Sequence, residues 1–131
     1  SVGTSLVALD HGEMWSGQLQ VANDKAAETV DLIRQIWADV AKNGVTQEEL
    51  DAAKTYMTGA YPLRFDGNGR IASILVGMQI LGLGVDYQIH RNDRITAVTL
   101  DDVKRVAARL MRPDQLGFVV VGDATGLKSS E

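Results

Sequence analysis

Apolar and polar residues alternate along the first part of the chain, over residues 1–9 and again over residues 13–21. A period of two is typical of strands that bury one face. Asp10-His11-Gly12, between the two stretches, has the composition of a hairpin connection. The pattern therefore predicts a β-hairpin, with these apolar side chains on one face: Val2, Leu6, Ala8, Trp15, Leu19 and Val21.

From residue 23 onward the apolar positions recur every three or four residues, which is typical of amphipathic helices. Asn23 or Asp24 is expected to cap the first helix, and Gly44 to end it. Thr46 and Thr99 each begin a capping-box pattern that predicts a helix start. The spacing predicts five helices, over residues 24–43, 47–61, 70–81, 86–96 and 100–112. The third is expected to be largely buried.

A continuous apolar run from Leu116 to Val121 closes the pattern and predicts a buried central strand. The order is then strand, strand, helices, strand. Such segregated elements predict an α+β fold, in which an antiparallel β-sheet is backed by a layer of helices. Residues 1–126 are expected to form this unit, and residues 127–131 a tail.

Composition narrows the possible functions. The 131 residues, 45% hydrophobic and 23% charged, are typical of one soluble domain or a large piece of one. The chain has no cysteine, which removes disulfides and thiolate zinc sites. The net charge of −4, without a basic stripe, argues against nucleic-acid binding. No apolar run has membrane-spanning length, so no membrane span is expected.

Residues able to hold a catalytic metal are few. A catalytic zinc ion takes three protein ligands, often two histidines one helical turn apart. His11 and His90 are the two histidines, and neither has a second histidine at that spacing. The acidic pairs 48–49 and 101–102 fall in first helical turns, where they complement the helix dipole. No catalytic and no metal-binding residue is therefore predicted.

One segment carries candidate binding chemistry. Tyr61-Pro62-Leu63-Arg64-Phe65-Asp66, followed by Arg70, places aromatic and cationic side chains on a connection between helices. One interpretation is a packed connector with Arg64 on the surface. The other is a cationic groove lining, built from Tyr61, Arg64 and Arg70, that binds peptide carbonyls or carboxylates.

Four stretches together resemble the insulinase/pitrilysin family of zinc peptidases, in its bacterial two-domain or two-subunit form. They keep the family's order and spacing: Thr46–Lys54, Tyr61–Asp66, Ile95–Val103 and Phe118–Gly122. Within that family the chain is most similar to the distal part of the non-catalytic domain.

The resemblance implies that the parent protein is a zinc metallopeptidase, whereas this chain alone does not cut. Family members pair two similar domains around a chamber, and one domain carries the zinc motif His-x-x-Glu-His. The catalytic zinc is thus expected in a partner domain or subunit, with no cofactor in this chain. The partner domain and a peptide substrate are the implied partners. An Arg and a Tyr that touch substrate in the family would fall before Ser1, and the location implied is periplasmic or secreted.

Three further expectations stay open from the sequence. If the first strands of the domain precede this segment, an uncovered sheet edge would promote self-association. The same fold also occurs in scaffold subunits that do not cut peptides. An unrelated α+β module that binds a small ligand is the third reading.

Overall fold

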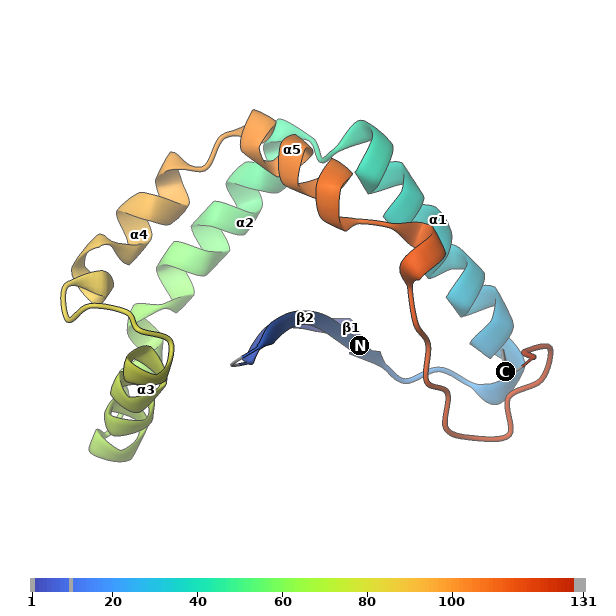
Figure 1. Ribbon diagram of the computed structural model, residues 1–131, viewed down its shortest axis with the longest axis horizontal. Helices are drawn as coiled ribbons and strands as arrows, with labels where there is room; N and C mark the ends of the chain where they lie inside the picture. Colours follow the sequence, from blue (N-terminus) through green and yellow to red (C-terminus); the bar gives the residue numbers. More distant parts are fainter. Residues whose placement is uncertain (1, 10, 129–131) are drawn as a thin grey trace.

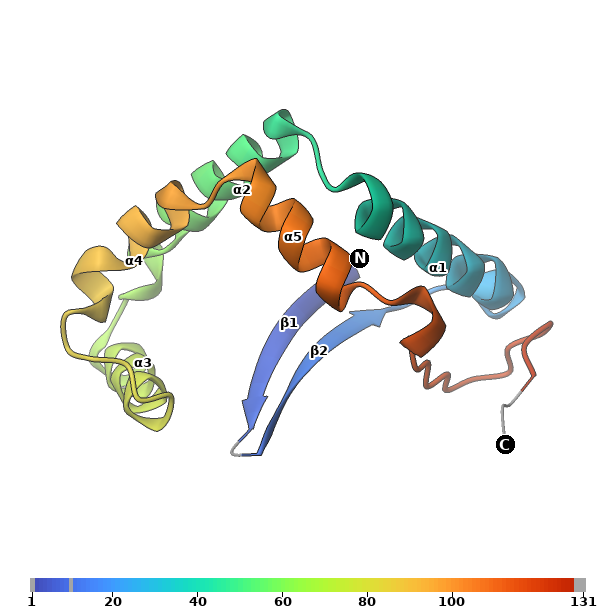
Figure 2. The ribbon, with the colours of Figure 1, turned by 45° about the horizontal axis from the view of Figure 1, so that its top comes forward.

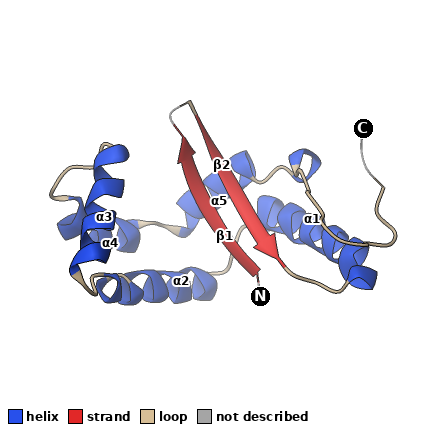
Figure 3. Cartoon of the chain, turned by 90° about the horizontal axis from the view of Figure 1, so that it is seen from below, coloured by secondary structure: helices blue, strands red, loops and turns tan. Residues whose placement is uncertain are grey.

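The computed structural model describes residues 2–9 and 11–128. Helices form an arch over these residues, and a two-stranded sheet lies on its concave side (Figure 1). Seen from below, the hairpin crosses the arch (Figure 3). On one side of it lies α1 (Ala26–Asn43), and on the other lie α2 (Gln47–Ala60), α3 (Asn68–Ile80) and α4 (Tyr87–Ala97). The class is α+β, which confirms the predicted fold class.

The sheet is an antiparallel pair of β1 (Val2–Leu9) and β2 (Gly12–Leu19). Leu6 lies opposite Trp15 in this register, so the two predicted apolar sets share one face. The predicted hairpin is confirmed, although Asp10 of its connection lies outside the described residues.

The two tryptophans join the hairpin to the arch. The rings of Trp15 in β2 and Trp37 in α1 lie 4.7 Å apart, tilted by 47°. Trp15 remains 44% exposed and Trp37 is half-buried. The pair is therefore a contact between two elements and not part of a buried core.

Five helices occupy the positions that the apolar spacing predicts. Helix α1 is preceded by a 3₁₀ turn over residues 23–25. No side chain caps its first turn, so the cap predicted at Asn23 or Asp24 is wrong. Gly44 ends α1 as predicted, with a positive φ of 74° that glycine adopts readily, but its ψ of −153° differs from the left-handed helical cap that was expected. The bounds are α1 Ala26–Asn43, α2 Gln47–Ala60, α3 Asn68–Ile80, α4 Tyr87–Ala97 and α5 Leu100–Leu110. No helix within the described part of the chain combines the length and apolar character that crossing a membrane requires.

Both predicted capping boxes form. The Thr46 hydroxyl accepts the Glu49 N–H at 3.2 Å, and the Glu49 carboxylate accepts the Thr46 N–H at 2.8 Å. Thr99 and Asp102 make the same reciprocal pair at the start of α5, each at 3.1 Å. Each box satisfies two backbone N–H groups that a helix start would otherwise leave unpaired.

The capping box of α5 predicts a measurable titration. The pKa of Asp102 is lowered from 3.8 to about 2, chiefly by the Thr99 hydroxyl that donates to its carboxylate at 2.6 Å, and then by Arg105. Because the pKa is depressed in the folded state, this contribution to stability is present above about pH 4 and lost as the pH falls through about 2. Carboxyl chemical shifts should give a midpoint near 2, rising towards the ordinary value in Thr99→Ala; a wild-type midpoint near 4 would contradict the capping box.

Little of the described chain is buried. The buried apolar residues of the described chain are Ala26, Leu50, Met78, Ala107 and Met111, and each keeps 6–8% of its surface exposed. The expectation of a largely buried third helix is wrong, because Ile80 is 74% exposed and Met78 is the one buried residue of α3. The accessible surface is 10464 Å², whereas a compact monomer of 14.2 kDa has about 6,800 Å². The arch therefore leaves large faces uncovered.

The predicted final strand is also wrong. Residues 116–121 have no regular secondary structure and join no sheet, because β1 and β2 pair only with each other in the described residues. Figure 2 shows a helical turn after α5, the 3₁₀ turn Pro113–Gln115, and then open chain beneath α1. One link of this open chain to the arch is the Phe118 ring, whose centre lies 5.3 Å from the guanidinium carbon of Arg34. A β-branched run favours extended backbone, but a strand also needs a partner. Of the predicted tail 127–131, residues 129–131 lie outside the described residues.

Candidate functional site

The three residues predicted to line a groove lie on one open hollow. Tyr61, Arg64 and Arg70 all line a depression of about 640 Å³ between the end of α2, the 3₁₀ turn Pro62–Arg64, α3 and α4. The other lining residues are Ser73, Ile74, Gly77, Met78, Leu81, Leu83, Tyr87 and Arg91. The sequence placed the first three on one connector, and the fold adds the walls from α3 and α4. We call this depression the arginine hollow.

One face of α3 supplies most of the wall. The lining positions 70, 73, 74, 77, 78 and 81 lie at offsets of 0, 3, 4, 7, 8 and 11 from Arg70, so they fall on one side of the helix. Arg70 stands in the first turn, and Met78 and Leu81 stand near the end. The wall therefore changes from cationic to apolar along the helix.

Arg91 fixes the aromatic side of the hollow. Its guanidinium carbon lies 3.9 Å from the centre of the Tyr61 ring, within the range of a cation–π contact. The same group donates to the Met57 carbonyl at 3.2 Å and to the Asn92 side-chain oxygen at 3.0 Å. Tyr61 also meets Phe65 edge-to-face, with centroids 5.2 Å apart. These contacts hold the tyrosine ring in place between α2 and α4.

Sequence reasoning missed Arg91 and Tyr87. They are four residues apart on α4, so they share a face, but the chain places them far from Tyr61. The sequence shows only that a tyrosine and an arginine lie four residues apart on a predicted helix. That spacing does not show which other helix they contact. The hollow needs the tertiary contact between α2 and α4, which helical spacing alone does not predict.

The arginine hollow carries positive charge without a paired carboxylate. Within the described residues the ion pairs are Lys25–Glu28, Arg105–Asp102 and Arg112–Asp114, none of which involves the hollow. Arg64 and Arg70 are solvent-exposed, and Arg91 is half-buried. Guanidinium groups bind carboxylates in a two-pronged geometry. The arrangement is suited to holding an anionic group.

A second hollow, of about 460 Å³, runs along the hairpin. Its lining residues are Val2, Gly3, Thr4, Ser5, Ser16 and Gln18. None of them is charged or aromatic, so the hollow has no group that would fix an anion or stack on a ring. It is a weaker candidate than the arginine hollow.

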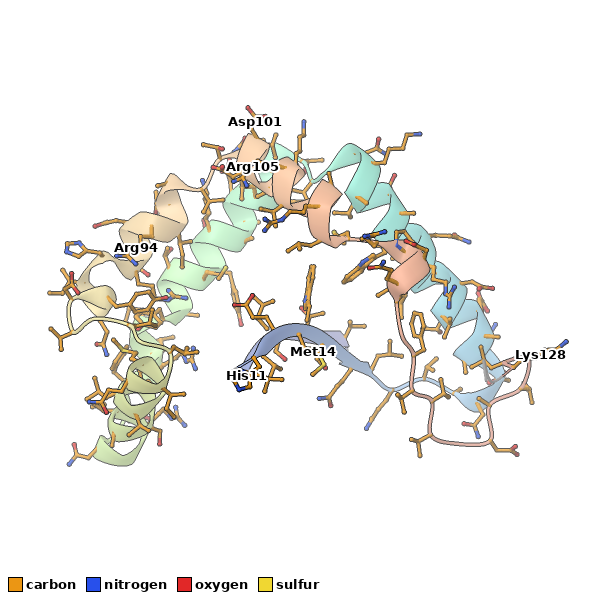
Figure 4. All side chains as sticks on the ribbon, viewed as in Figure 1. His11, Met14, Arg94, Asp101, Arg105 and Lys128 are labelled. Carbon is orange, nitrogen blue, oxygen red and sulfur yellow. The ribbon has the colours of Figure 1, made fainter. Side chains whose placement is uncertain are left out.

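The histidines and the acidic pairs do not assemble a metal site among residues 2–9 and 11–128. There, no three His, Asp or Glu side chains come close enough together to hold an ion. His11 lies at the turn of the hairpin, whereas His90 belongs to α4 (Figure 4). Asp101 lies at the crown of the arch, on the side away from the hairpin (Figure 4). No residue of the acidic pairs 48–49 and 101–102 lines either hollow.

Comparison with known proteins links the chain to one family. Residues 1–57 match the family model described as the Peptidase M16 inactive domain. A curated relative, the non-peptidase homolog YmxG of Helicobacter pylori (strain ATCC 700392 / 26695), is 25% identical over 108 residues. The match covers 82% of this chain and 25% of the relative, so the chain spans about a quarter of that protein's length. No solved structure is significantly similar. The two matches support a relationship to the C-terminal, inactive domain of M16 peptidases.

Proposed function

We propose that this chain is a non-catalytic, substrate-holding part of a zinc-dependent peptidase of the insulinase/pitrilysin type, the M16 family. The observation that carries the proposal is the match of residues 1–57 to the inactive domain of that family. The arginine hollow adds a surface on which a peptide could be held. A non-catalytic role is also consistent with a relative that is named a non-peptidase.

In this proposal the chemistry is divided between two domains. A partner domain or subunit of the same family holds the zinc ion, which polarises the peptide carbonyl and activates water. This chain holds the peptide and supplies no cofactor of its own. Holding a peptide in register raises the rate because it removes the entropy cost of orienting the bond to be cut.

The open arch leaves room for such a partner. The accessible surface of 10464 Å² exceeds that of a compact monomer of this mass by about 3,700 Å². A standard protein interface buries about 800 Å² on each partner. The uncovered area is thus large enough for a partner domain and also for a second copy of the chain.

We further propose that the parent protein acts in the periplasm or outside the cell, because the chain resembles bacterial members that are exported. Cell fractionation of the full-length protein, followed by immunodetection, tests this placement. A protein confined to the cytoplasmic fraction would overturn it and leave the substrate-holding proposal intact.

The proposal is tested by peptide hydrolysis in a reconstituted assembly. The 131-residue chain and the zinc-bearing partner domain or subunit are produced separately and assayed apart and together on fluorogenic peptides. We expect no hydrolysis by this protein alone and at least about a tenfold gain in kcat/KM when it joins the partner, because an oriented peptide reacts faster. Zinc-dependent hydrolysis by this protein alone would refute the proposal.

The second candidate function is a structural scaffold of the same fold. The name of the relative, non-peptidase homolog YmxG, favours it. A scaffold would stabilise its partner without touching the peptide. If this chain is a scaffold, removing it would lower the amount of assembled partner seen in size-exclusion chromatography. The partner that still assembles would keep its KM. A small-ligand module unrelated to any peptidase is not favoured, given the match to the inactive domain.

A further inference from the structure

We infer that the arginine hollow selects peptide segments in which an acidic side chain and a large apolar side chain lie close together in the sequence. The inference rests on the proposed function and names the substrate class of the same site. It follows from the order in which charge, aromatic rings and apolar groups line the depression.

The cationic end recognises a carboxylate. Arg64 and Arg70 line the hollow, are exposed and form no ion pair within the described residues. A carboxylate between them would gain charge-assisted hydrogen bonds at little desolvation cost, since both guanidinium groups keep contact with water. A lysine side chain at the same point would meet two like charges.

The Tyr61 ring is held for stacking or packing beside that end. Arg91 covers one side of the ring at 3.9 Å and is itself tied to the Met57 carbonyl. A ring fixed in this way presents its remaining surface without further loss of side-chain freedom. Arg91 is thus a positioning residue, and Arg64 and Arg70 are the groups that would contact the ligand.

The apolar end recognises the neighbouring side chain. Ile74, Met78, Leu81 and Leu83 line the hollow beyond the cationic end. Leu81 is 54% exposed in the free chain, so covering it with an apolar side chain removes surface from water. The volume of about 640 Å³ lies within the usual range for ligand sites and admits two or three residues of an extended peptide.

Binding of labelled peptides to the full-length protein, followed by fluorescence anisotropy, tests the inference. The probes are decapeptides with a central Glu-Gly-Leu, the same sequence with Gln or Lys in place of Glu, and one with Ala in place of Leu. All four have amidated ends, and a fifth, the Gln peptide with a free C-terminus, separates a side-chain carboxylate from a terminal one. We expect the Glu peptide to bind roughly twofold to fivefold more tightly than the Gln peptide, within the range for an exposed charge pair.

The Arg64→Gln/Arg70→Gln variant should remove this preference, since both exposed side chains can change without disturbing a buried group. Arg109→Gln, which removes an exposed charge from α5 outside the hollow, should keep it. Circular dichroism confirms that each variant is folded.

Equal affinity for the Glu, Gln and Lys peptides would overturn the carboxylate preference, and equal affinity for the Leu and Ala peptides would overturn the apolar one. Tighter binding of the free C-terminus than of the internal glutamate would reassign the site to chain ends and overturn the segment inference. In each case the hydrolysis assay of the reconstituted pair still decides the proposed function independently, because it scores dependence on this protein and not peptide selectivity.

Discussion

We expect this chain to self-associate, and replacing Val119 and Val121 by lysine should make it a monomer. These side chains are 94% and 95% exposed in a segment that joins no sheet within the described residues. Extended, uncharged segments of β-branched residues pair readily with other strands, and they also bury apolar surface when they do so. Two lysines on the same side of the segment oppose that pairing through like-charge repulsion between copies.

Light scattering across a range of concentrations measures the effect. The wild-type chain should show a mass that rises above 14.2 kDa with concentration, and the double variant should hold that value. Val85→Lys is the matched control, because Val85 is 98% exposed but lies in the connection before α4. A strictly monomeric wild-type chain at high concentration would refute self-association, and an equal effect of Val85→Lys would move it away from residues 116–121.

Trp37→Ala should lower the free energy of unfolding by about 2–3 kcal/mol, below the range for a fully buried tryptophan because Trp37 is half-buried. The substitution removes the ring that joins α1 to the hairpin through Trp15, 4.7 Å away. Urea unfolding measures the loss, and near-ultraviolet circular dichroism should lose the signal of two coupled indoles.

A double-mutant cycle separates the pair from the packing of each ring. Trp15→Ala, Trp37→Ala and the double variant should give a coupling of about 0.5–1.5 kcal/mol, the usual range for aromatic pairs. Additive effects of the two substitutions would show that the rings do not stabilise each other. A change below about 0.5 kcal/mol in Trp37→Ala would place the ring outside any stabilising contact.

Local signals in the sequence predicted the elements well. The capping boxes at Thr46 and Thr99 are complete within four residues, so nothing distant is needed to form them. The hairpin is equally local, because its two strands are joined by a short connection and pair only with each other in the described residues.

Apart from the side-chain cap predicted at Asn23 or Asp24, the failed predictions concern features that need distant neighbours. Residues 116–121 have the composition of a strand, but a strand needs a partner edge, and neither β1 nor β2 provides one here. Helix α3 is rich in apolar residues, yet burial depends on what packs against it, and α3 lies at one end of the arch (Figure 1). The composition of a segment indicates which secondary structure it favours. It does not indicate which other segment packs against it.

The candidate site divides in the same way. Tyr61, Arg64 and Arg70 were found because they are close together in the sequence. Arg91 was missed because its contact with Tyr61 depends on how α4 packs beside α2. The binding role of Arg64 and Arg70 is the proposal that the peptide experiments test.

The KM of the reconstituted peptidase tests the central claim most directly. The assembly is assayed with wild-type protein, with Arg64→Gln/Arg70→Gln and with Arg109→Gln as the matched control. If this chain holds the peptide through the arginine hollow, the double variant should raise KM roughly twofold to fivefold with little change in kcat, because it removes binding shared by ground and transition states. An unchanged KM in a fully assembled double variant would contradict substrate holding by the hollow.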